Sequence, residues 1–194
     1  MKPTCVVLLA LLCAAPLRAQ QSAAAAANPI TAAFRGRTMA LQRNLAQAFD
    51  SIPESKFAYK PTPAQLTIGD IAQHLANDNY AFCESFGEMK ATRAAEDTAT
   101  ADSVKGKWPK AKLVAKLKES FDFCTKAFAQ LQDSNLADSV TLSYEGRTFH
   151  TSRASMALGH ALDMADHYSQ IANYMRLNGI LPPTALPRPR QSGE

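Results

Sequence analysis

The stretch HALDMADHYSQIANYMRLNGILPP, residues 160–183, decides the predicted fold. Its apolar residues Met164, Ile171 and Tyr174 are seven and three positions apart, which places them on one side of a helix, as on the core-facing side of an amphipathic helix. The Asn-Gly pair near its end is typical of a helix C-terminus, and the two prolines that follow prevent the helix from resuming. The stretch therefore predicts a long last helix with one side buried.

Three earlier segments have the same helical periodicity over roughly 20 residues each. They span about residues 29–49, 67–86 and 109–131. Thr67 and Asp70 form a capping-box pattern at the start of the second segment. Because helices of this length with few strands between them pack side by side, we expect an all-α protein of the four-helix-bundle class.

Two connections between these helices have distinct patterns. Residues 140–151, VTLSYEGRTFHT, alternate around a Glu-Gly pair and predict a short β-hairpin directly before the last helix, which Ser152 is placed to cap. Residues 89–107, MKATRAAEDTATADSVKGK, are polar and are expected to form a long loop.

The N-terminus has the pattern of a secretory signal peptide. Lys2 precedes an apolar run from Cys5 to Ala15, and Ala19 supplies a small residue at an expected cleavage point. The run is shorter than the roughly 20 apolar residues that a membrane span needs. We therefore expect an exported protein, periplasmic or extracellular, without a stable membrane anchor.

These observations divide the chain into four parts. Residues 1–19 are the expected signal peptide. Residues 20–28, QQSAAAAAN, have the low complexity of a disordered lead-in. Residues 29–183 are the expected bundle. Residues 184–194 have the composition of a flexible tail.

The charge balance excludes some partners. Removing Lys2 and Arg18 with the signal from the 21 basic residues leaves 19, against 17 acidic residues, a net charge of about +2. Because there is also no basic stripe with interleaved aromatic residues, we expect no nucleic-acid partner. The sequence has no glycine-rich phosphate loop, Cys-x-x-Cys pair or His-Glu-x-x-His motif.

Two cysteines, Cys83 and Cys124, remain after removal of the signal. In an oxidising compartment this even number is compatible with a disulfide, which closes a long loop and stabilises by up to about 4 kcal/mol. Two small buried thiols in separate helices are the alternative.

The core-facing stripe of the last helix also carries polar groups, namely His160, Asp163 and His167. Asp163 and His167 are four residues apart and can touch or share a ligand. His74 lies close to the apolar face of the second helix. Burying such groups without partners costs several kcal/mol, and a metal ion would satisfy three of them together. Two imidazoles and a carboxylate leave positions open on the ion, as in catalytic sites.

The same stripe is also compatible with a core that holds no metal. A single histidine on an apolar face is most often a hydrogen-bonded core residue. Asp163 and His167 fit a simple ion pair within one helix, or a structural polar network, equally well.

Two segments together resemble the DinB-like superfamily of metalloenzymes. They are IGDIAQHLANDNYAFCESF, residues 68–86, and ADHYSQIANYMRLNGILPP, residues 165–183, and the proline-rich YKPTP precedes the first. The resemblance extends over about residues 30–183. It implies a four-helix bundle, often a homodimer, with a metal held by one histidine of the second helix and a His-x-x-x-His pair of the fourth.

Carried over by position, this pattern places His74 and His167 as ligands of a divalent transition metal: zinc, nickel, iron or manganese. Asp163 stands where the family usually has the remaining histidine, which favours a harder metal, and His160 is the fallback ligand. Asp78 is a candidate to orient His74, and Gln170 a candidate to hydrogen-bond near the site.

The resemblance implies a metal-dependent enzyme such as a thiol-dependent transferase or isomerase, in which the ion activates a thiol as nucleophile. Because small thiols are mainly cytosolic, we expect an exported protein at least equally to be a hydrolase that activates a metal-bound water. The small-molecule substrate is not indicated by any motif. The alternative is an exported, non-catalytic helical bundle whose polar site is vestigial or purely structural.

Overall fold

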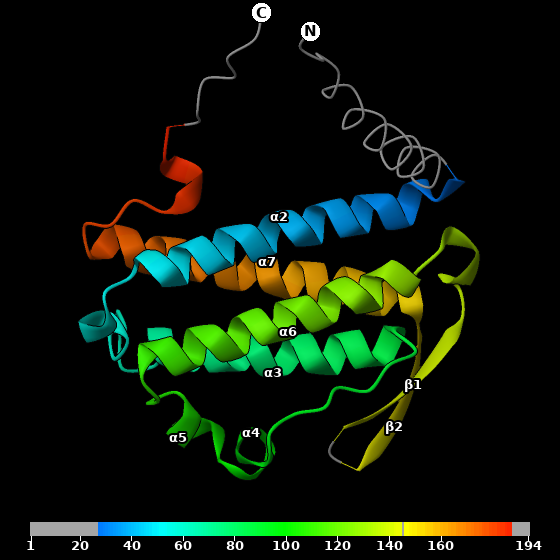
Figure 1. Ribbon diagram of the computed structural model, residues 1–194, viewed down its shortest axis with the longest axis horizontal. Helices are drawn as coiled ribbons and strands as arrows, with labels where there is room; N and C mark the ends of the chain where they lie inside the picture. The colour runs from blue at the N-terminus through cyan, green and yellow to red at the C-terminus, as the bar shows by residue number, and fades with distance from the viewer. Residues whose placement is uncertain (1–26, 145, 188–194) are drawn as a thin grey trace, which may run out of the picture.

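The computed structural model describes residues 27–144 and 146–187. Its four long helices are α2 (Pro29–Ser51), α3 (Ile68–Phe86), α6 (Lys110–Gln130) and α7 (Arg153–Leu177). Each packs against two neighbours, in the order α2, α6, α3, α7 around the bundle (Figure 1). The predicted four-helix class is confirmed. The expected signal peptide, most of the lead-in and the end of the tail lie outside the described residues.

The connections determine the direction of each helix (Figure 1). After α3, the chain returns along the bundle before α6 begins, so α3 and α6 run in the same direction, and α7 runs back against α3. As a result, the end of α3 lies beside the end of α6 and the beginning of α7. The beginning of α3 lies beside the second half of α7.

The helix ends follow the sequence signals. Thr67 accepts a hydrogen bond from the backbone N–H of Asp70 and donates its own N–H to the Asp70 carboxylate, which completes the capping box of α3. Ser152 accepts from the backbone N–H of Ser155 at the start of α7. After α7, Gly179 adopts a φ of 71°, a left-handed conformation that glycine tolerates best.

The predicted hairpin is present directly before α7. Strands β1 (Ser139–Tyr144) and β2 (Arg147–Ser152) pair antiparallel, with Ser139 opposite Ser152. Gly146 in the turn has a φ of 73°. The hairpin extends from the end of the bundle at which α6 stops and α7 begins (Figure 1).

The residues expected to form one loop, 89–107, contain two short helices, α4 (Ala95–Ala99) and α5 (Asp102–Lys105). Buried charges hold them in place. The Lys105 ammonium donates to the Asp97 carbonyl at 3.1 Å, and Lys116 of α6 pairs with the Asp97 carboxylate at 2.9 Å. A hydrophobic-periodicity argument misses these helices because their anchors are ionic and the helices are about one turn long.

Two clusters of apolar side chains form the core. The larger occupies the half of the bundle where α3 begins, with Leu45, Ile71, Leu75, Leu117 and Ile171 among its fully buried members. The smaller lies at the hairpin end and surrounds Cys83 and Cys124. Polar side chains are set into both halves, on the α3 and α7 faces.

The start of the expected tail is folded back on the bundle. The 3-10 turn η3 (Pro183–Ala185) contacts α2, and the Tyr168 hydroxyl donates to Thr184 Oγ1 at 2.9 Å. Among the described helices, none combines the length and apolar character needed to cross a membrane.

Candidate metal centre

Three of the predicted ligands meet between α3 and α7. His74 comes from α3, and Asp163 and His167 lie one turn apart on α7. One ligand atom from each residue lies within 4.8 Å of the other two. The His74 and His167 rings are nearly perpendicular, with centroids 4.9 Å apart. The structure therefore brings together side chains that are about 90 residues apart in sequence.

Both ring nitrogens of His167 face an acceptor. Nε2 lies 3.5 Å from Asp163 Oδ1, and Nδ1 lies 3.3 Å from Gln170 Oε1. Burial lowers the pKa of His167, but Asp163 and Gln170 favour the imidazolium more strongly, so the pKa is raised above its ordinary value. A bound cation would replace that proton: Nδ1–H would stay on Gln170, and the Nε2 lone pair would be free beside the carboxylate.

His74 is oriented in a similar way by Asp78. The Asp78 carboxylate lies 3.2 Å from His74 Nε2, one helical turn away. Burial raises the pKa of Asp78; His74 opposes that shift, and Asp163 reinforces it by charge repulsion. The Asp163 carboxylate thus lies close enough to disfavour the ionised form of Asp78, and a cation between them would relieve this repulsion.

Asp163 has a carboxylate oxygen that is available to bind a metal ion. Its Oδ2 is buried and has no hydrogen-bond partner among the described residues. The ion-pair partners of Asp78 and Asp163 are histidines, not lysines or arginines. A buried, unpartnered carboxylate oxygen costs free energy, and a metal ion is one means of offsetting that cost.

The three ligands differ in exposure. The His74 side chain is 39% exposed, whereas that of His167 is only 8% exposed. His74 therefore lies at the surface of the bundle and His167 lies inside it.

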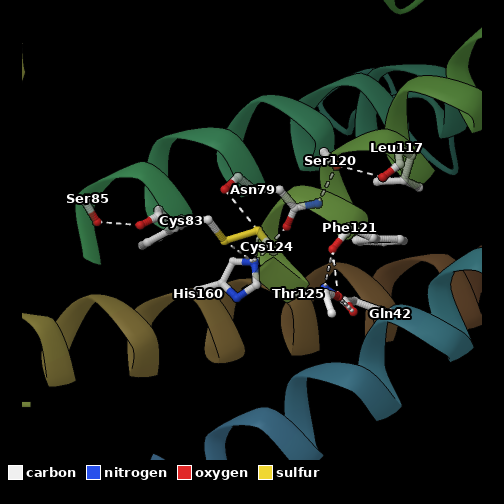
Figure 2. The surroundings of a disulfide bond; sticks show 11 residues. Gln42, Asn79, Cys83, Ser85, Leu117, Ser120, Phe121, Cys124, Thr125 and His160 are labelled. Carbon is white, nitrogen blue, oxygen red and sulfur yellow. Dashed lines mark hydrogen bonds between the residues drawn. A yellow bond between two sulfur atoms is a disulfide. The ribbon is translucent and has the colours of Figure 1, made fainter. Parts of the chain in front are cut away.

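His160, the fallback ligand, lies elsewhere (Figure 2). It is fully buried near the hairpin end, where Cys83 of α3 and Cys124 of α6 form a disulfide. Its Nε2 lies 3.8 Å from Cys83 Sγ and 3.6 Å from Cys124 Sγ. Figure 2 shows the ring directed at the two sulfur atoms.

The surroundings of His160 keep it neutral. Burial lowers its pKa to about 4, and the Asp163 carboxylate opposes this shift without outweighing it. The rings of Phe82, Phe86 and Phe128 pack around it at 5.5–6.3 Å between centroids. Nε2 is 2.8 Å from Asn79 Oδ1 and is the nitrogen placed to donate, whereas the buried Nδ1 has no partner within the described chain.

Asn79 links this second group together and was not singled out from the sequence. Fully buried, it donates to Ser120 Oγ at 2.8 Å and accepts from His160. The sequence signal was present: Asn79 lies one turn before Cys83 on α3, so an asparagine shares the side of the helix that carries the cysteine.

Comparison with known families and structures supports this fold. The profile of the DinB superfamily matches residues 37–171, more than half of the chain. No curated protein matches the sequence.

Several solved structures share the fold. A mutant of a mycothiol-dependent maleylpyruvate isomerase is 11% identical, with a TM-score of 0.57, over 73% of this chain and 60% of that one. This chain therefore spans less than two thirds of the isomerase. A DinB-like protein from Bacillus cereus is 13% identical, with a TM-score of 0.57, over 74% of this chain and 89% of its own.

YfiT from Bacillus subtilis, described as a probable metal-dependent hydrolase with an unusual four-helix bundle topology, is 16% identical. The match has a TM-score of 0.56 and covers 80% of this chain and 99% of YfiT. At these identities the three matches establish a common fold.

Proposed function

Because this chain belongs to the DinB superfamily, we propose that it is a metal-dependent hydrolase or transferase whose ion is held by His74, Asp163 and His167. One observation carries the proposal. Ligand atoms of His74, Asp163 and His167, from two helices, lie within 4.8 Å of one another, and a second oxygen-ligand candidate, the buried Asp163 Oδ2, has no hydrogen-bond partner within the described chain.

The donor set fits a divalent transition metal. Two imidazoles and one carboxylate suit zinc, iron, nickel or manganese, and three protein ligands leave positions for other molecules. An ion there would act as a Lewis acid that lowers the pKa of a water or thiol bound beside the substrate.

The remaining residues prepare the ligands. Gln170 accepts from His167 Nδ1 and is itself fixed by donating to Asp166 at 2.9 Å, so the His167 ring is held with Nε2 towards Asp163. Asp78 restricts the rotation of His74. Because this ligand is the most exposed of the three, substrate would enter from its side.

The likeness to a described hydrolase favours water over a thiol as the nucleophile. YfiT, whose fold covers most of this chain, is described as a probable hydrolase. Thiol transfer, which the likeness to the mycothiol-dependent isomerase suggests, is the second candidate.

We also propose that the protein acts outside the cytoplasm. The signal-peptide pattern of the first 19 residues and the Cys83–Cys124 disulfide both support this, since disulfides persist in oxidising compartments.

Metal analysis of the untagged mature protein tests the proposal. Wild type should hold about one equivalent of a transition metal, and His74→Ala, Asp163→Ala and His167→Ala should lose it. His150→Ala, which removes an exposed histidine of the hairpin, is the matched control and should keep it. Loaded wild type should then hydrolyse ester probes or transfer thiols, and Asp163→Ala should do neither.

Two results would contradict parts of this assignment. Absence of metal even after reconstitution would leave a bundle with a structural polar network. A stoichiometric ion without turnover on either class of probe would favour the non-catalytic binding protein.

A further inference from the structure

The second polar group, Cys83, Cys124 and His160, offers a metal-ligand set of its own. One atom of each residue lies within 4.8 Å of the others, and all three side chains are fully buried. The residues come from α3, α6 and α7, so three of the four long helices meet there (Figure 2). We propose that, when the disulfide is reduced, this group binds a thiophilic divalent ion such as zinc.

The distances from the imidazole to the sulfurs suit such an ion. With Zn–S bonds of about 2.3 Å and Zn–N bonds of about 2.0–2.1 Å, tetrahedral ligand sulfur and nitrogen atoms lie about 3.5–3.6 Å apart. His160 Nε2 is 3.6 Å from Cys124 Sγ and 3.8 Å from Cys83 Sγ. Once the S–S bond is broken, the sulfurs would need to separate to about 3.8 Å, which side-chain rotation can provide.

The charges also suit the apolar interior. Two thiolates, a neutral imidazole and a divalent ion sum to zero, so no net charge is buried. Burial already keeps His160 neutral beside Phe82, Phe86 and Phe128. An ion held by the imidazole and an intact disulfide would instead bury an uncompensated double charge, and reduction is therefore the condition for binding.

The chemical step is a thiol–disulfide exchange followed by metal binding. An external dithiol transfers two electrons and two protons to the Cys83–Cys124 bond, which opens to two thiols while the dithiol becomes a disulfide. The ion then displaces both thiol protons, and two S–metal bonds form. Before metal arrives, the Cys124 thiol has an acceptor available, since the Asn79 carbonyl oxygen lies 3.2 Å from Cys124 Sγ.

Binding has a cost at His160. Nε2 must give up its hydrogen bond to Asn79, and the ring proton must move to Nδ1, which lacks an acceptor within the described chain. We therefore expect weaker binding than at a four-cysteine zinc site. Reoxidation to the disulfide removes both thiolates and should release the ion.

Cobalt titration distinguishes this site from the His74 centre, because only a sulfur ligand gives a thiolate-to-cobalt charge-transfer band in the near ultraviolet. The mature Asp163→Asn protein, with the first centre disabled, is reduced with a phosphine in mild denaturant, returned to buffer and titrated with Co²⁺. We expect the band to saturate at about one equivalent, to be displaced by Zn²⁺ and to be absent from the oxidised protein.

The variants assign the ligands. Cys83→Ser and Cys124→Ser should each lose the band, and His160→Gln should weaken binding at least tenfold. His150→Ala is the matched control and should bind like its parent. Circular dichroism, recorded in parallel, reports the fold.

Three outcomes would overturn the proposal. They are a folded, reduced protein without the band, a reduced protein that stays unfolded with and without cobalt, and a band in His160→Gln with unchanged affinity. None depends on the His74 centre, whose failure would show instead as metal-free oxidised wild type.

Discussion

His160 and His167 lie two turns apart on one helix, and their surroundings differ in the hydrogen-bond acceptors and in the apolar groups that face each ring. His167 faces two acceptors, and its pKa is raised; His160 lies among three phenylalanine rings and a disulfide, and its pKa falls to about 4. His167 is therefore placed to bind a proton or a metal ion, whereas His160 stays in its neutral form. The comparison shows that burial, set against the hydrogen-bond acceptors and charges that face the ring, decides what a buried histidine does, and that position on a helix stripe does not.

The largest expected effect on stability concerns the Cys83–Cys124 disulfide beside His160. The Cys83→Ser, Cys124→Ser double variant should lose up to about 4 kcal/mol of unfolding free energy, because the disulfide closes a 41-residue separation. Asp163→Asn in metal-free protein should change it by less than this, since the substitution keeps the size of the side chain and its ion-pair partner is a single histidine at 3.5 Å. Urea unfolding of both measures the contrast. Equal losses would mean that the two groups contribute alike to the fold.

Lowering the pH should change the contributions of the two histidines to stability in opposite directions. Because the pKa of His160 is lower in the folded protein than its ordinary 6.5, its stabilising contribution is complete above pH 6.5 and is lost as the pH falls towards 4. The loss corresponds to about 3 kcal/mol. His167 has the opposite sign: its raised pKa stabilises the fold at acid pH, and this is lost as the pH rises through that pKa.

Unfolding free energies at pH 7 and pH 4 check this. His160→Gln should lose less stability on acidification than wild type, and His167→Gln should lose more. The same pH slope in all three proteins would refute the assignment.

In the oxidised protein, added metal should bind and stabilise only through the centre formed by His74, Asp163 and His167. With free zinc at 100 times its Kd, wild type should gain about 2.7 kcal/mol. The His160→Gln protein should gain as much, and Asp163→Asn should gain nothing. Thermal unfolding with zinc or with chelator measures the gain, and an undiminished gain in Asp163→Asn would exclude that carboxylate as a ligand.

The smallest change concerns one hydrogen bond. Gln170→Ala removes the acceptor on Nδ1 and should lower the pKa of His167 in metal-free protein, with His160 unaffected. Titration of the histidine ring protons by NMR follows both residues in one experiment. A raised or unchanged pKa of His167 would show that Gln170 does not favour the imidazolium.

The sequence predicted the bundle because its signals are local. Periodic apolar residues, the Thr67 cap and the Gly179 stop each act within a few residues, and each is present in the structure. The cap of α2 is different. The Asp133 carboxylate, just after α6, accepts from the backbone N–H groups of Ile30 and Thr31. No sequence pattern within α2 predicts a capping residue that lies about 100 residues later in the chain.

The site illustrates the same limit. His160 and His167 share a stripe, but seven residues correspond to a rise of about 10.5 Å, so they do not reach one ion. The antiparallel packing of α3 on α7 pairs His74 with His167 and, nine residues further along α3, Cys83 with His160. Which polar groups meet depended on helix direction, and that direction depends on the excursion between α3 and α6.

The disulfide also gives the chain an unusual covalent connectivity. Both short helices, α4 and α5, lie inside the loop that Cys83 and Cys124 close. A protease that cuts this excursion would produce two fragments, one with His74 and the other with Asp163 and His167, still joined through sulfur. The nicked protein would migrate as one species until a reductant separated the two fragments, and until then His74 would stay covalently joined to the fragment that carries Asp163 and His167.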